Sequence, residues 1–170
     1  MKIIQIVGFS NSGKTTLVEK LVSHSTQHSL RVGTIKHHGH GGELRSQDEG
    51  KDSWRHRQAG ALISSAVSKG VLQLNVLQEK EWAPDELLKL YLNFPIDVVI
   101  VEGFKQSPYQ KVVLIKKSSD IQLLSTLENI ICVISWIPLD DDVKQKLDIV
   151  YYQLEDESNY INFLLQKLKG

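Results

Sequence analysis

The sequence has a single cysteine, no excess of charge of either sign and no long apolar segment, and each absence excludes a class of protein. Cys132 alone cannot form an intramolecular disulfide, which fits a reducing compartment. Every apolar run is shorter than the about 20 residues that a membrane helix needs, and the run at residues 2–7 is too short for a signal peptide. We therefore expect a cytoplasmic protein without a membrane partner.

The charges of the chain cancel. Its 20 Lys and Arg residues balance 20 Asp and Glu residues, so no global field directs it to nucleic acid, and we expect no nucleic-acid partner. Any anion site must be local. A hydrophobic content of 41% with 24% charged residues is typical of a folded chain, and 170 residues suffice for one domain. We therefore expect a single nucleotide-binding domain over residues 1–170.

Short runs rich in isoleucine and valine alternate with helical patterns. These runs lie at residues 2–7, 31–36, 97–102, 129–135 and 148–152. Because they are apolar on both faces, they predict strands of a mostly parallel sheet that is covered by helices on both sides. The fold class is therefore α/β, a three-layer fold like that of the P-loop NTPases, with its ligand at the carboxyl ends of the strands.

One stretch departs from this alternation. The segments 61–67 and 71–77 flank Ser68-Lys69-Gly70 and predict an added β-hairpin. Either the hairpin extends the sheet as an antiparallel edge, or its open edge pairs with a second copy of the chain to give a homodimer.

The strongest motif follows the first predicted strand. The segment Gly8-Phe9-Ser10-Asn11-Ser12-Gly13-Lys14-Thr15 matches G-x-x-x-x-G-K-S/T at every fixed position and precedes an amphipathic helix. Backbone N–H groups in such a loop satisfy phosphate oxygens, and its glycines permit close approach. The loop predicts binding of a nucleoside triphosphate.

Individual side chains of this segment have separate expected roles. Lys14 should bridge the terminal phosphates, and the Thr15 hydroxyl should coordinate Mg²⁺. The hydroxyl and N–H of Thr16 lie within reach of the α-phosphate. Ser10, Asn11 and Ser12 supply further N–H groups for the phosphates.

A second acid is expected at the end of another strand. Glu102 ends the apolar run 97–102, where it either holds Mg²⁺, directly or through water, or faces solvent. Asp97 begins the same run and should lie at the opposite edge of the sheet, so we assign it no role.

Further motifs follow in order over roughly the first two-thirds of the chain. They are Gly33-Thr34-Ile35-Lys36-His37, Gly50-Lys51-Asp52-Ser53, Arg57-Gln58-Ala59-Gly60-Ala61 and Val101-Glu102-Gly103-Phe104-Lys105. Together with the segment 8–15 they resemble MobB, the family of GTP-binding proteins of molybdopterin guanine dinucleotide biosynthesis. The resemblance implies a homodimer that binds GTP with Mg²⁺ and assists a MobA-like guanylyltransferase, which attaches GMP to molybdopterin or its molybdenum-bound form.

The resemblance also implies further residues that line the site, namely Lys36, Asp52, Ser53, Arg57, Glu102 and Lys105. Asp52 either contacts the ligands of Mg²⁺ or caps the helix that begins near Ser53. Arg57 either binds phosphate or pterin anions through two contacts or lies solvated on a helix face. Lys36 and Lys105 are expected to form a positive rim.

Two loops leave alternatives open. His37, His38 and His40 lie among glycines, and a polar loop near the active site is favoured over a metal site because no nearby cysteine completes a tetrahedral set.

Guanine recognition rests on the resemblance, because the Asn/Thr-Lys-x-Asp motif is missing. Trp136, Pro138 and Asp140 are the candidates for contacts to the base, although Trp136 could equally be a core aromatic.

For hydrolysis we assign Lys14 and Glu102 the catalytic roles, through charge stabilisation and metal orientation. No glutamine or arginine stands out as a residue that positions water, so we expect weak GTPase activity. Two other readings are a small-molecule kinase whose segment 37–51 closes over an acceptor, and a nucleotide-binding adaptor without chemistry of its own.

Overall fold

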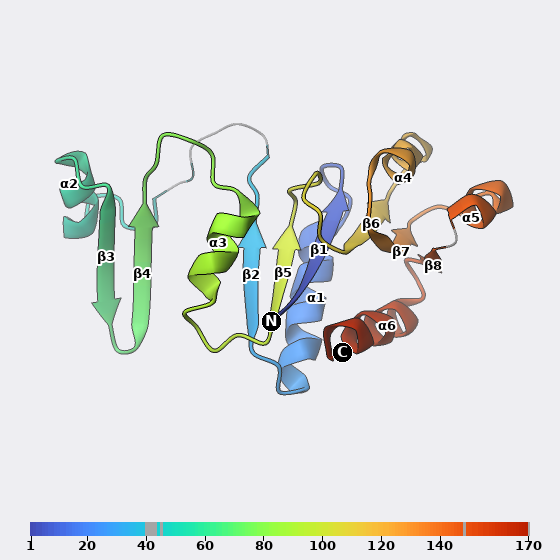
Figure 1. Ribbon diagram of the computed structural model, residues 1–170, viewed down its shortest axis with the longest axis horizontal. Helices are drawn as coiled ribbons and strands as arrows, with labels where there is room; N and C mark the ends of the chain where they lie inside the picture. Colours follow the sequence, from blue (N-terminus) through green and yellow to red (C-terminus); the bar gives the residue numbers. More distant parts are fainter. Residues whose placement is uncertain (40–43, 45, 148, 170) are drawn as a thin grey trace. The chain divides into compact units, whose positions relative to one another are not determined.

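The structure of the chain is a computed structural model that describes residues 1–39, 44, 46–147 and 149–169 (Figure 1). The chain divides into two compact units, one made of Met1–Gly39 with Pro84–Gly170 and the other of His40–Ala83. The single domain stays a prediction. No helix within the described ranges is long and apolar enough to cross a membrane.

A six-stranded parallel sheet carries the first unit. Its strands lie in the order β2-β5-β1-β6-β7-β8, and every pair of neighbours is parallel. Their bounds are Lys2–Gly8 for β1, Val32–Lys36 for β2, Val98–Glu102 for β5, Lys111–Ile115 for β6, Ile130–Ser135 for β7 and Val150–Gln153 for β8. The predicted parallel sheet is confirmed.

Strand β6 is a correction to the sequence-based account, which had no strand at Lys111–Ile115. All five residues of this strand are buried, including the lysine. The run is short and has a lysine on each side of its apolar residues, so periodicity alone did not distinguish it from a loop. It lies directly beside β1 and therefore beside the Gly8–Thr15 segment.

Helices cover both faces of this sheet, as Figure 1 shows. Helices α1 (Lys14–Gln27) and α6 (Glu157–Lys169) pack on one face against alternate strand residues such as Ile4, Ile100 and Leu114. Helix α3 (Pro84–Tyr91) packs on the other face against Val99 and Val101. The 3₁₀ helix η1 (Ser118–Gln122), α4 (Leu123–Thr126) and α5 (Asp141–Leu147) complete that layer. The predicted three layers are confirmed.

The second unit contains helix α2 (Asp52–Gln58) and the predicted hairpin, β3 (Ile63–Ser68) and β4 (Val71–Val76). Lys69 and Gly70 form the turn with φ of 45° and 79°, the positive values that a two-residue hairpin turn of type I′ requires. The two strands form a two-stranded sheet of their own, so the alternative of an antiparallel extension of the main sheet is wrong.

Candidate functional site

The loop from Gly8 to Thr15 connects β1 to α1 at the carboxyl edge of the sheet. Two of its residues have left-handed backbone, Asn11 with φ of 59° and Gly13 with φ of 93°. A Cβ at Gly8 would lie 2.4 Å from Ser12 Oγ and 3.0 Å from the carbonyl oxygen of Leu114, so any side chain there would force the loop to shift. Ser12 Oγ is itself buried and has no hydrogen-bond partner among the described residues. A compact turn of this kind, with left-handed residues, is the backbone form in which consecutive N–H groups can bind a phosphate.

Lys14 bridges the loop that contains it. Its Nζ donates a hydrogen bond to the backbone carbonyl of Phe9 at 2.7 Å. Burial lowers the pKa of Lys14, Glu102 opposes that shift, and the positive charges of Lys105 and Lys36 add to it. The ammonium groups of these three lysines therefore lie close enough to raise each other's electrostatic energy, which favours an anion of high charge.

Glu102 and Thr15 meet beside this loop. Parallel pairing places Glu102 opposite Ile6, at the end of β5 next to β1. Thr15 Oγ1 donates to Glu102 at 3.1 and 3.2 Å from its two carboxylate oxygens. The carboxylate is only 9% exposed, so the alternative of an acid facing solvent is wrong.

The ammonium of Lys36 binds both of these groups. Its Nζ lies 3.1 Å from Glu102 Oε1 and donates to Thr15 Oγ1 at 3.1 Å. The hydroxyl oxygen of Thr15 and a carboxylate oxygen of Glu102 thus already bind one cation, the Lys36 ammonium. Hydroxyl and carboxylate oxygens are the ligands that Mg²⁺ prefers, so this pair fits the predicted ion.

The loop after Glu102 is held by a buried amide. Gln5 Nε2 donates to the carbonyls of Gly103, at 2.6 Å, and of Phe104. Gly103 has φ of 95°, and a Cβ there would lie 2.8 Å from His37 Cβ, so only glycine fits. The Phe104 ring stacks on His37 with 4.3 Å between centroids.

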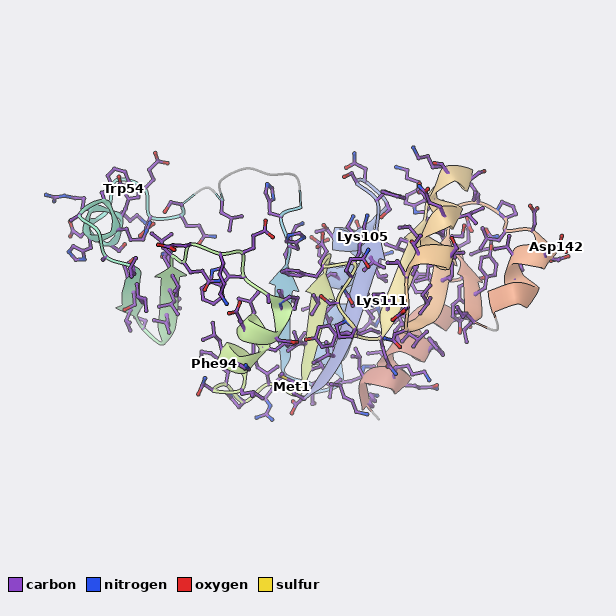
Figure 2. The ribbon with its side chains drawn as sticks, turned by 45° about the horizontal axis from the view of Figure 1, so that its top comes forward. Met1, Trp54, Phe94, Lys105, Lys111 and Asp142 are labelled. Carbon is purple, nitrogen blue, oxygen red and sulfur yellow. The ribbon has the colours of Figure 1, made fainter. Side chains whose placement is uncertain are left out.

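The predicted lysine rim lies in the first unit with the loop. Lys105 projects beyond the end of β5 (Figure 2), and its Nζ lies 4.2 Å from the centre of the Phe9 ring.

His37 and His38 follow β2, whereas His40 lies outside the described residues. Within the described ranges no three His, Cys, Asp or Glu side chains form a group that could hold a metal ion.

Two side chains, each just after the end of a neighbouring strand, donate hydrogen bonds to the backbone of the Gly8–Thr15 loop. Trp136, after β7, donates its indole N–H to the carbonyl of Ser12 at 3.1 Å. Lys116, after β6, donates to the carbonyl of Asn11 at 2.9 Å and lies 5.2 Å from the centre of the Trp136 ring. Trp136 is 43% exposed, so the alternative of a core aromatic is wrong. Sequence reasoning missed Lys116 because it missed β6.

Asp52 and Arg57 belong to the second unit. Lys51 occupies the N-cap position of α2 and Asp52 is its first residue, so the alternative of a capping role for Asp52 is wrong. Asp52 is well exposed and lies 3.7 Å from Arg55. Arg57 is 8% exposed, so the alternative of a solvated helix-face arginine is also wrong.

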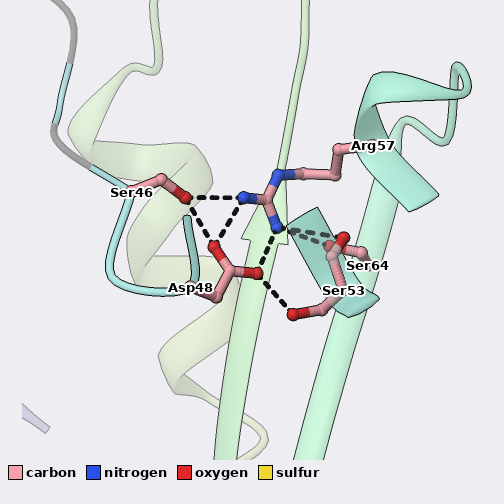
Figure 3. A network of polar contacts seen from close by, with 5 residues as sticks. All are labelled: Ser46, Asp48, Ser53, Arg57 and Ser64. Atoms are coloured by element: carbon pink, nitrogen blue, oxygen red, sulfur yellow. Dashed lines mark hydrogen bonds and ion pairs between the residues drawn. The ribbon is translucent and has the colours of Figure 1, made fainter. Parts of the chain in front are cut away.

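Arg57 instead makes its two-point contact with Asp48 (Figure 3). The two guanidinium nitrogens lie 2.6 and 2.7 Å from the two carboxylate oxygens, and they also donate to the hydroxyls of Ser46 and Ser64. Ser53 donates to Asp48 as well. The hydrogen bonds that Asp48 accepts from Arg57, Ser46 and Ser53 hold its pKa well below the usual range, and the bond from Arg57 has the largest effect. Asp48 had no sequence signal beyond its place nine residues before Arg57.

Asp97 lies where the sequence predicted, at the opposite edge of the sheet. Its carboxylate accepts from the side chain of Arg31 at 2.7 and 2.9 Å and from the backbone N–H of Arg31 at 2.9 Å. The pair joins the start of β5 to the start of β2 and explains why the acid occurs there.

Comparison with known proteins gives one consistent result. The family model of molybdopterin guanine dinucleotide synthesis protein B, MobB, matches residues 3–136. A probable molybdopterin-guanine dinucleotide biosynthesis adapter protein of Bacillus subtilis is 37% identical over 168 residues, 99% of this chain and 94% of that protein. The adapter protein of Haemophilus influenzae is 35% identical over 149 residues, 86% of this chain and 81% of that protein.

Solved structures agree with these sequence relatives. Bacillus subtilis MobB superimposes with a TM-score of 0.81 at 34% identity, over 100% of this chain and 99% of that chain. A MobB protein homolog from Bacillus stearothermophilus gives a TM-score of 0.80 at 34% identity, over 99% of both chains. The predicted P-loop NTPase-like α/β fold is therefore confirmed.

Proposed function

Since this chain belongs to the MobB family of molybdopterin guanine dinucleotide synthesis proteins, we propose that it is a GTP-binding adapter in the synthesis of that dinucleotide. Its relatives from Bacillus subtilis and Haemophilus influenzae are named as adapter proteins of this pathway. In this proposal the chain acts in the cytoplasm and assists the guanylyltransferase that joins GMP to molybdopterin or its molybdenum-bound form.

One observation carries the nucleotide part of the proposal. The hydroxyl of Thr15 and the buried carboxylate of Glu102 lie 3.1 Å apart beside a tight glycine loop that Lys14 bridges. In a protein with zero net charge, this is where three lysines gather. The N–H groups of residues 10–16 would bind the phosphates, and the dipole of α1 adds to their attraction.

Thr15 and Glu102 would hold Mg²⁺, which neutralises charge on the β- and γ-phosphates when bound. Lys14, now bound to the Phe9 carbonyl, would bind the terminal phosphates, and Lys36 and Lys105 would supply the outer positive charge. Gln5, the glutamine beside Glu102, is buried and its amide nitrogen is bound to the carbonyls of Gly103 and Phe104, so it is not placed to position a water molecule and intrinsic hydrolysis of GTP is slow. The GTPase activity is thus weak and accessory.

The segment after β7 is our candidate for base recognition. Trp136 already binds the phosphate loop, and Pro138 and Asp140 follow it at the carboxyl edge of the sheet. A carboxylate at Asp140 can accept from the two N–H groups on the Watson–Crick edge of guanine, which adenine lacks.

The hairpin is our candidate for the homodimer contact. Cross-strand pairing puts Ile63 opposite Val76, Ser65 opposite Leu74 and Val67 opposite Leu72, so one face of the hairpin is almost wholly apolar. On that face Ile63, Val67, Leu72 and Leu74 are 62%, 73%, 51% and 48% exposed. An apolar face of this kind on a two-stranded sheet is stabilised by a partner surface.

A reconstituted synthesis assay tests the adapter role. It measures guanine dinucleotide formed from molybdopterin and limiting GTP by the guanylyltransferase, with and without this protein. We expect the wild-type chain to raise the rate and Lys14→Ala to abolish the gain. Lys169→Ala, at the end of α6, is the matched control that keeps the gain. Equal rates with and without the wild-type chain would refute the proposal.

A further inference from the structure

A cleft lies outside the phosphate loop, on the side away from Glu102. Its volume is about 520 Å³, and one wall is formed by Phe9 and Ser10. The opposite wall follows β6 and consists of Lys116, Lys117, Ser119, Asp120 and Gln122. None of the groups assigned to Mg²⁺ lines it. The cleft is therefore a separate place that shares only the first turn of the loop.

The topology of the sheet explains why a cleft forms here. From β1 the chain crosses to β2 on one side, and it later places β6 on the other side of β1. The connections that leave the carboxyl ends of β1 and β6 therefore diverge, and ligands of open α/β sheets bind in such crevices. The volume falls within the range of small-molecule sites and far exceeds that of one phosphate ion.

The charges that border the cleft are positive. Lys116 and Lys117 are exposed along one wall, and Lys105 lies over the Phe9 ring that forms the other. The single lining carboxylate, Asp120, is 2% exposed and accepts from the backbone N–H groups of Lys116 at 3.0 Å and Lys117 at 3.2 Å. Asp120 thus shapes the wall, and the lysines remain as its cationic surface.

The cleft also combines an apolar wall with polar donors. The Phe9 ring and the lysine stems offer a surface for a flat ring, and Ser119 and Gln122 offer hydrogen bonds. The matching ligand is a small heterocyclic molecule with a phosphate monoester. Its binding would couple to the nucleotide through Lys116, because the Lys116 ammonium donates to the carbonyl of Asn11 in the phosphate loop.

We propose that this cleft binds the second substrate of the pathway, molybdopterin, by its terminal phosphate through Lys117 and Lys116. This proposal rests on the adapter function proposed above, which includes molybdopterin as a reactant but assigns it no binding site on this chain. It makes the chain a carrier of both reactants, GTP in the phosphate loop and the pterin phosphate beside it.

Equilibrium binding of molybdopterin to the full-length protein, loaded with Mg²⁺ and a non-hydrolysable GTP analogue, tests this assignment. We expect Lys117→Glu to weaken molybdopterin binding at least about 10-fold, the effect of losing a charge-assisted hydrogen bond, and Lys117→Arg to retain it. The affinity of Lys117→Glu for the GTP analogue, titrated alone, should change less than about twofold, because Lys117 contacts neither Thr15 nor Glu102. Lys169→Glu is the control with the same change of charge.

The dephosphorylated pterin forms the second arm of this experiment. We expect it to bind the wild-type protein weakly and to bind Lys117→Glu no more weakly. Equal binding of both pterins, unchanged binding by Lys117→Glu, or no binding of molybdopterin by GTP-loaded protein would each overturn the assignment. Failure of the GTP analogue to bind in its own titration would instead refute the proposed function.

Discussion

The indole N–H of Trp136 donates a hydrogen bond to the backbone carbonyl of Ser12, with 3.1 Å between nitrogen and oxygen. The segment that follows β7 is thereby joined to the loop that follows β1. The same ring lies 3.5 Å from the place where a Cβ of Gly13 would be. We therefore expect a change at Trp136 to affect binding at the loop.

Replacing Trp136 tests this link. Trp136→Phe keeps an aromatic ring and removes the N–H, so we expect GTP affinity to fall by about 3- to 10-fold, the effect of one neutral hydrogen bond. Trp136→Ala should cost more, because the loop also loses the packing of the ring. Isothermal titration with Mg²⁺ present measures both. Full affinity in Trp136→Phe would show that the bond does not position the loop.

Glu102→Gln tests the metal pair. The amide keeps the shape of the side chain and its bond to Thr15 but removes the charge that faces the cation. We expect at least about 10 times more Mg²⁺ to be needed for half-maximal GTP binding, because a charged contact is replaced by a neutral one. Asp97→Asn, at the opposite edge of the sheet, is the matched control and should leave this Mg²⁺ requirement unchanged. An unaltered Mg²⁺ requirement in Glu102→Gln would contradict the assignment.

The Asp48–Arg57 pair predicts a pH dependence of the second unit. The folded pKa of Asp48 lies well below its ordinary value of 3.8, mainly through Arg57. A carboxyl with a lowered pKa contributes stability that is present above its unfolded pKa and lost as pH falls through the folded value. We therefore expect the amides of α2 to lose hydrogen-exchange protection as the pH falls below about 4.

Two variants make this prediction specific. Asp48→Asn should reduce the protection of α2 at neutral pH and remove most of its pH dependence, because no carboxylate is left to titrate. Asp52→Asn changes an exposed acid of the same unit and should leave both nearly unchanged. A protection profile that Asp48→Asn does not alter would show that the pair is not what orders this unit.

The apolar face of the hairpin predicts the oligomeric state. We expect the wild-type chain to sediment as a dimer, and Leu72→Lys to shift it to the monomer because a charge then enters the contact. Gln73→Lys places the same charge on the opposite face of β4 and should remain dimeric. A monomeric wild-type chain, or equal behaviour of the two variants, would exclude this face as the interface.

Local signals decided how much of this protein was predictable. The segment Gly8–Thr15, the hairpin turn at Lys69-Gly70 and the acid at the end of β5 each have a motif within a few residues, and each was found. Lys116 and Asp48 have no such motif. Their positions matter only because β6 lies beside β1 and because a loop returns Asp48 to Arg57. A contact between distant parts of the chain sets the role of Lys116, and the local path of one loop sets that of Asp48.

The alternatives for Asp52, Arg57 and Trp136 show the same limit. For each residue, one of the two open alternatives followed from its average preference: a helix cap for Asp52, a solvated side chain for Arg57 and a core position for Trp136. The structure places Asp52 one residue past the cap, buries Arg57 against a carboxylate and leaves Trp136 half-exposed. For Arg57 and Trp136 a tertiary partner outweighed the average preference of the residue, and for Asp52 the helix began one residue earlier than its cap role required.

Competition between nucleotides tests the central claim most directly. Labelled GTP is titrated with the wild-type protein in the presence of Mg²⁺, and unlabelled GTP or ATP is then added. We predict saturable binding, displacement by GTP, and little displacement by an equal concentration of ATP. Loss of binding in Lys14→Ala should accompany that result. Preference for ATP, or binding that Lys14→Ala retains in full, would contradict the account of a GTP-binding adapter.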